Sequence, residues 1–268
     1  MRLRFWRGGR KGLATSAGIS PRILLNGFAK RETLKAGIQA LPMTSDTLSW
    51  PAIGVLRAVQ LEPGRHMLAS PGDTVLQQLS YGRIVGAPSS GMIAFDTGGC
   101  ESLLVCRRGL GFVLVEDELY ELYPLDSLFI PCKTEVQIHA DGGGCELIEV
   151  LTRADGRSAV CFAGHEESAC PPASRLQLSI HAAPLSGRTE EVNLERLEIC
   201  LEATELRFAR TRSIDRMRVE ADDCLLIPAE SPVTIEGLEG IRHLTIALRE
   251  SAPGTDTPGD SPVQSPAA

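Results

Sequence analysis

The sequence predicts an all-β protein built from two tandem copies of one β-barrel domain, flanked by disordered extensions. Two observations support this prediction. Short apolar runs rich in Val, Ile and Leu are separated by 26 glycines and 17 prolines, a pattern typical of many short strands. In addition, one strand-turn-strand unit occurs twice, at a constant offset of 97 residues.

The N-terminal segment, residues 1–45, differs in charge from the rest of the chain. Residues 1–42 carry nine Lys and Arg against one acid, Glu32, although the whole chain has a net charge of −7. This segment is predicted to be a poorly ordered extension, with an organelle-targeting peptide as the alternative. The acidic body argues against nucleic acid and membrane as partners, and a cytoplasmic location is predicted.

The first predicted barrel spans residues 46–153. Residues 102–122 are expected to form two strands around a turn at Gly109-Leu110-Gly111, followed by a hairpin at Glu116-Asp117. Residues 126–140 then add a short buried strand that Pro131 ends, and an alternating strand after it. Such a run of short antiparallel strands predicts a sandwich or jelly roll.

A linker, residues 154–174, precedes the second predicted barrel, residues 175–250. The tail, residues 251–268, is rich in Pro, Ser, Gly and Asp and is predicted to be disordered. Eight cysteines include no Cys-x-x-Cys pair, so they are predicted to be reduced thiols.

The repeat pairs DSLFIPCKTEVQIHA (126–140) with DCLLIPAESPVTIEG (223–237). An acidic residue opens each copy, an apolar strand follows, and a proline ends that strand where the ladder should stop. Carried backward without a gap, the offset pairs Glu101 with Glu198.

The repeated unit resembles the second conserved motif of the cupin superfamily, G-D-x-x-x-I-P-x-G-x-x-H-x-x-x-N. Its framework positions are filled in both copies, by Asp126, Ile130 and Pro131 and by Asp223, Ile227 and Pro228. The chain therefore resembles a degenerate bicupin, which implies two jelly-roll barrels in tandem.

The resemblance also implies where a metal ion would lie. Metal-binding cupins carry a His-x-His and a Glu in the first motif and a further His in the second. This chain has no His-x-His, and the second-motif ligand position holds Val136 in one copy and Val233 in the other. An aliphatic side chain cannot ligate a cation, so no metal or other cofactor is predicted.

The candidate ligand-binding residues are those expected to face the barrel interiors. They are Glu101, at the first-motif acid position, with Val136, Ile138, Val233 and Ile235. No catalytic residue is assigned.

An alternative places a divalent metal at Gln137 and His139. This pair resembles the Gln-x-His zinc ligands of class I phosphomannose isomerases, which are cupin-fold enzymes, and the second half of the chain is similar to their C-terminal part. However, side chains alternate along a strand, so Gln137 and His139 point outward if Val136 points inward.

Two functions therefore stay open. One is a metal-free bicupin that binds a small molecule, senses it or assembles, with a homodimer through sheet faces or edges as a further prediction. The other is a cupin-fold isomerase or epimerase acting on a sugar or sugar phosphate.

Overall fold

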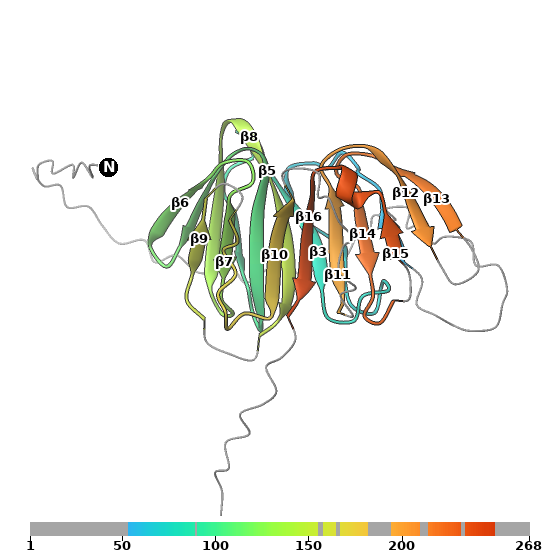
Figure 1. The fold of residues 1–268 in the computed structure, drawn as a ribbon. Helices are drawn as coiled ribbons and strands as arrows, with labels where there is room; N and C mark the ends of the chain where they lie inside the picture. The colour runs from blue at the N-terminus through green and yellow to red at the C-terminus, as the bar shows by residue number, and fades with distance from the viewer. Residues whose placement is uncertain are drawn as a thin grey trace, which may run out of the picture. The chain divides into compact units, whose positions relative to one another are not determined.

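The computed structural model of the chain describes residues 53–88, 90–154, 158–164, 167–181, 194–209, 214–231 and 234–249. Within these ranges the protein consists of β-strands and one short 3-10 helix, η1 (Leu238–Gly240). The strands form two barrels (Figure 1), which confirms the predicted fold class. The predicted extensions, residues 1–45 and 251–268, lie outside the described residues.

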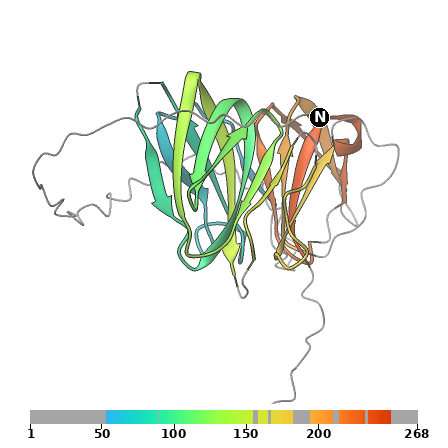
Figure 2. The same ribbon diagram turned by 90° about the vertical axis from the view of Figure 1, so that its left-hand side faces the viewer.

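The first barrel is a single sheet folded into two layers. Its strands are β2 (Gly64–Ala69), β3 (Ser80–Gly86), β4 (Ile93–Asp96), β5 (Cys100–Val115), β6 (Glu118–Leu122), β7 (Ser127–Ile130), β8 (Glu135–Arg153) and β9 (Cys161–Ala163). One layer has the order β2-β3-β8-β5-β7-β9, and in the other β4 pairs with β8 and β6 with β5. The long strands β5 and β8 run through both layers (Figure 2).

Glycine allows β5 to bend between the layers. The strand is continuous, so residues 102–122 do not form two strands around a glycine turn as predicted; instead, bulges interrupt its pairing with β8 between Cys106 and Gly111. Gly109 has a φ of +72°, and a Cβ there would collide with the carbonyl oxygen of Gly144. The predicted hairpin at Glu116-Asp117 is present, and both residues have positive φ, as a tight two-residue turn requires.

The second barrel has two separate sheets. Its strands are β1 (Gly54–Leu56), β10 (Leu176–His181), β11 (Arg196–Cys200), β12 (Thr204–Ala209), β13 (Ile214–Val219), β14 (Cys224–Ile227), β15 (Thr234–Glu236) and β16 (His243–Leu248). The larger sheet has the order β1-β14-β11-β16-β10 and the smaller one β13-β12-β15.

The two copies of the repeat have the same local structure. The carboxylate of Asp126 accepts a hydrogen bond from the Tyr123 amide, and that of Asp223 accepts one from the Glu220 amide, each at 2.9 Å. In each copy the preceding residue has a positive φ, and a four-residue buried strand follows, β7 or β14. The acidic residue thus closes the turn that leads into the buried strand.

The repeat is not gapless upstream of this turn, and the predicted pairing of Glu101 with Glu198 is wrong. The Cys106 amide bonds to the Asp126 carbonyl at 2.9 Å, and the Cys200 amide bonds to the Asp223 carbonyl at 3.0 Å. Cys200 is therefore the counterpart of Cys106, at an offset of 94 (200 − 106), because the connection that follows is three residues longer in the second copy. The counterpart of Glu101 is Glu195.

Two short strands belong to a different barrel from the one that the sequence assigned. β1, predicted in the first barrel, pairs with β14 of the second, and β9, predicted in the linker, pairs with β7 of the first. The copies thus exchange their leading strands. The physical reason is that β7 and β14 are apolar and buried, so a further strand must satisfy the backbone groups along their outer edges.

The two barrels share a hydrophobic seam. One buried cluster combines residues of β5 and β8 with residues of β11, β14 and β16, whereas two other clusters fill the separate interiors. Arg107 and Arg108 of the first barrel also form ion pairs across the seam with Asp222 of the second. Burial opposes ionisation of Asp222, but the two arginines outweigh it and lower its pKa.

Two buried glutamates bridge the seam reciprocally. Glu101 of β5 accepts hydrogen bonds from the Ser174 hydroxyl and the Arg175 amide, both at 2.8 Å, just before β10. Its counterpart Glu195 accepts hydrogen bonds from three successive amides just before β3, those of Gln77, Gln78 and Leu79. Each barrel therefore supplies the carboxylate that satisfies backbone donors in the other.

We expect Glu195→Gln to lower the free energy of unfolding by about 2–4 kcal/mol, because an amide nitrogen would face N–H donors that then lack an acceptor. Chemical denaturation measures this change. The control is Glu205→Gln, since that side chain is 59% exposed in a 3.6 Å ion pair and should change stability by less than about 0.5 kcal/mol. Equal stability of the two variants would contradict the role of Glu195.

Candidate functional site

Apolar side chains occupy the predicted metal position in the first barrel. Val136 and Ile138 are both 1% exposed and belong to the interior cluster. Directly across from them on β4 lie Phe95 and Ile93, which pack against the same cluster. At these four inward positions, Val136, Ile138, Ile93 and Phe95, no side chain carries a metal-ligating atom.

An ion pair lies next to this apolar patch. The guanidinium of Arg65 on β2 donates two hydrogen bonds, of 2.7 and 2.9 Å, to the fully buried carboxylate of Glu149 on β8. The Arg65 guanidinium carbon lies 3.9 Å from the centroid of the Phe95 ring, and the Ser102 hydroxyl lies 3.5 Å from Glu149. The bidentate pairing neutralises a carboxylate that would otherwise be costly to bury, and the cation–π contact stabilises the Arg65 guanidinium.

The second barrel holds a different polar cluster. Glu198 accepts hydrogen bonds from Thr245 at 2.6 Å and from Arg196 at 3.0 Å, and burial raises its pKa. His243 is fully buried, with Nε2 4.0 Å from Glu198, and its ring stacks on that of His181 at a centroid distance of 4.3 Å.

The five residues predicted to face a barrel interior do not all do so in the structure. Val136, Ile138 and Ile235 lie in interior clusters, whereas Val233 lies outside the described residues. Glu101 does not face an interior, so that prediction is wrong: it shares the seam face of β5 with Leu103 and Val105. The inward residue at this point is its neighbour Ser102.

Gln137 and His139 lie on the outer face of β8, as strand alternation predicts. Gln137 is partly buried and His139 is exposed, while the residues between and beside them point inward. Within the described ranges, no three His, Cys, Asp or Glu side chains are grouped so as to hold a metal ion. The donor set in the described interiors therefore does not fit a metal centre of the kind that the motifs imply.

The buried cysteines belong to the packed core of the protein. All eight are free thiols, and four of them are buried: Cys106, Cys145, Cys200 and Cys224. Burial raises the pKa of Cys106 and of Cys200 to about 12, so both remain protonated and unreactive.

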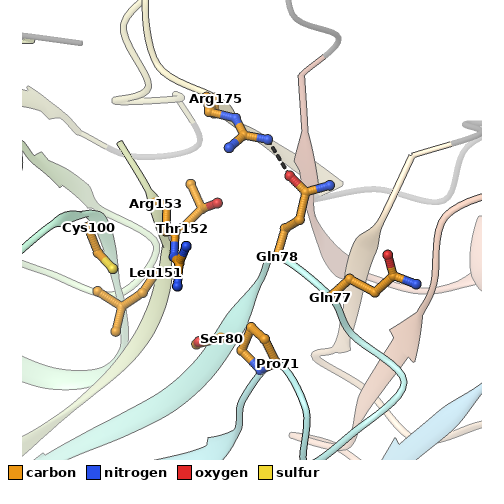
Figure 3. Close-up of a pocket in the computed structure, with 9 residues that line it drawn as sticks. All are labelled: Pro71, Gln77, Gln78, Ser80, Cys100, Leu151, Thr152, Arg153 and Arg175. Carbon is orange, nitrogen blue, oxygen red and sulfur yellow. Dashed lines mark hydrogen bonds between the residues drawn. The ribbon is translucent and has the colours of Figure 1, made fainter. Parts of the chain in front are cut away.

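A pocket opens at the seam rather than inside a barrel. Its volume is about 520 Å³, and its lining residues are Pro71, Gln77, Gln78, Ser80, Cys100, Leu151, Thr152, Arg153 and Arg175. Figure 3 shows Arg153 and Thr152 on one wall and Arg175, bonded to Gln78, on the other. The first barrel supplies all of the lining except Arg175, which precedes β10 of the second.

Known structures share this architecture. Protein Ylba from E. coli aligns over 81% of this chain and 96% of its own, with a TM-score of 0.61 at 13% identity. The fold is a bicupin. The putative glyoxylate induced protein from Pseudomonas aeruginosa (TM-score 0.53, 14% identity, 81% and 96% covered) and an iolb-like protein from Salmonella typhimurium LT2 (0.54, 15%, 74% and 93%) are also similar.

These similarities establish the fold alone. No family model and no curated protein sequence matches the chain. None of the three bicupin-like structures is a phosphomannose isomerase by name, so that part of the resemblance stays a prediction. In the described ranges no helix has the length and apolar character needed to cross a bilayer.

Sequence reasoning missed the polar groups of this bicupin. Arg65 and Glu149 are 84 residues apart and carry no motif. The alternation of β8 offered one signal, because Glu149 interrupts the run of apolar residues from Leu147 to Leu151 on the inward face. The seam pocket had no such signal, since its walls come from strand ends and loops that only the fold brings together.

The stacked histidines predict a pH dependence of stability. Burial, and then the neighbouring His243, lower the pKa of His181 below 6.5, although Glu198 opposes this. A lowered pKa means that the unfolded chain takes up a proton that the folded protein does not, so stability falls as the pH drops through 6.5. We expect His181→Gln to lose less unfolding free energy between pH 8 and about pH 5.5 than the wild type. Parallel denaturation curves at both pH values measure this, and equal losses would contradict it.

Proposed function

We propose that this bicupin is a metal-independent small-molecule-binding protein whose ligand site is the seam pocket. The single observation that carries the proposal is the pocket itself, a hollow of about 520 Å³ whose lining is partly polar and partly apolar. That volume lies within the range of roughly 300–1,000 Å³ that small-molecule sites occupy.

The contents of the first interior support metal independence. Phe95 faces Val136 where ligands would be needed, and Arg65 already neutralises the buried carboxylate of Glu149. A divalent cation beside that guanidinium would meet strong charge repulsion and no free ligand set.

The candidate residues of the isomerase alternative do not lie together at one site. Glu101 is bonded to the seam, and Gln137 and His139 lie on the opposite side of β8 from the interior. Among the described residues we identify no acid and base that face a substrate-sized cavity inside a barrel. The geometry therefore favours binding over catalysis.

Metal analysis gives the first test. We expect the purified full-length protein to contain well below one equivalent of any transition metal, and EDTA to leave its melting temperature unchanged. A stoichiometric metal whose removal lowers the melting temperature would overturn metal independence.

A ligand panel gives the second test. Thermal-shift screening of neutral, cationic and anionic metabolites against EDTA-treated protein should find at least one that raises the melting temperature. Gln78→Trp, an exposed lining position filled by a larger ring, should abolish that shift, whereas Gln60→Trp, an exposed glutamine outside the pocket, should retain it. A shift that persists in Gln78→Trp would place the site elsewhere.

A further inference from the structure

We propose that the seam pocket recognises a small hydroxylated anion whose carboxylate or phosphate head is bound by Arg153 and Arg175. This inference rests on the proposed binding function and names the class of ligand. It is argued from the charge of the walls, from one buried hydroxyl and from the comparison of the two copies.

The charged side chains that line the pocket are all arginines. Arg153 is exposed at the end of β8, and it forms no ion pair or hydrogen bond with any side chain that the structure describes. Arg175 lies across the pocket and donates to the carboxamide oxygen of Gln78 (Figure 3). Guanidinium groups bind carboxylate and phosphate through paired N–H donors, so two on facing walls favour an anion.

Two buried carboxylates of the described residues lie close to the pocket without lining it. Glu101 and Glu195 lie behind the walls, where the amides and the hydroxyl described above bind their oxygens. Neither carboxylate lines the pocket or bonds the Arg153 guanidinium. A ligand at the pocket surface therefore meets the two guanidinium groups first.

Thr152 adds an independent observation. The residue is 1% exposed, and its hydroxyl has no hydrogen-bond partner among the described residues. A buried hydroxyl without a hydrogen-bond partner destabilises the folded protein. In Figure 3 this oxygen lies on the side facing the Gln78 wall, so a ligand there could supply the missing partner.

The second copy shows that the fold does not require this hydroxyl. Thr152 pairs with Glu101, and Leu248 bonds to the backbone of Glu195, so Leu248 is the counterpart of Thr152. An apolar residue thus takes the same place in the second copy.

The neighbouring arginines differ in the same way. Arg249, the counterpart of Arg153, donates to the carbonyl oxygens of Pro171 and Pro172 at 3.1 and 2.7 Å. It is therefore a structural arginine, whereas Arg153 has no such acceptors. The polar pair at 152–153 is specific to the copy that carries the pocket.

The remaining lining favours hydroxyl groups on the ligand body. The Ser80 hydroxyl and the carboxamides of Gln77 and Gln78 can each donate and accept, while the apolar part of the lining can contact the carbon skeleton of the ligand. An unsubstituted fatty chain or an aromatic ring would leave these groups unpaired, which lowers affinity.

Isothermal titration of the EDTA-treated full chain tests the class. The probes are citrate, glucose 6-phosphate and inorganic phosphate, with glucose as the neutral control; comparing citrate with the phosphates identifies the head group. We expect at least one hydroxylated anion to bind, and Arg153→Ala to weaken it about tenfold or more. Arg218→Ala, which removes a 76% exposed arginine outside the pocket, should leave the affinity unchanged.

Thr152→Val separates a ligand-binding role from a structural one. It keeps the shape and removes the unpaired hydroxyl, so we expect a higher melting temperature without ligand and about tenfold weaker binding of the same anion. A higher melting temperature with unchanged affinity would overturn the role of Thr152.

The remaining outcomes are distinguishable. If no anion binds but a neutral or cationic compound does, and Gln78→Trp blocks it, the ligand class is wrong and the proposed function stands. If no compound of any class binds at the pocket, both are wrong.

Discussion

The mutual burial of Glu101 and Glu195 is the interaction on which the rest of the structure depends. Each carboxylate leaves water only because amides of the other barrel donate to it, so neither barrel can close its own side of the seam. The exchange of β1 and β9 has the same effect at the sheet edges, because each barrel pairs with a strand from the sequence of the other copy. The two barrels are therefore one folding unit, although the chain encodes them one after the other.

The two interiors each contain a buried carboxylate, but it lies at a different position of the fold in each barrel. Both contain a carboxylate bonded to an arginine, but Glu149 lies on β8 in the first barrel, and its counterpart in the second is Thr245. There Glu198, on β11, is the buried acid, and it pairs with Arg196 of the same strand. The copies share backbone and turn chemistry, whereas their interior polar groups are not equivalent.

The parts predictable from sequence are those determined by local chemistry. Asp126 closes a turn and Pro131 follows the last residue of a buried strand, and both effects depend only on neighbouring residues. The fold and the repeat are therefore predictable from the sequence. The pairing of Glu101 with Glu198 is wrong because a connection that is three residues longer in the second copy shifts the register without changing the motif. The exchanged strands are three residues long, too short to show periodicity, and Arg65 meets Glu149 only after β2 and β8 are both in place.

The position of the pocket follows from these constraints. Apolar clusters and ion pairs occupy the described interiors, and the pocket opens instead at the seam between the two barrels. Its walls are the strand ends and loops that Glu101 and Glu195 position. A ligand there contacts both barrels, with Arg153 on one and Arg175 on the other. Because those two residues face one pocket only when the seam is closed, the proposed ligand would link its own binding to barrel association, and each would stabilise the other.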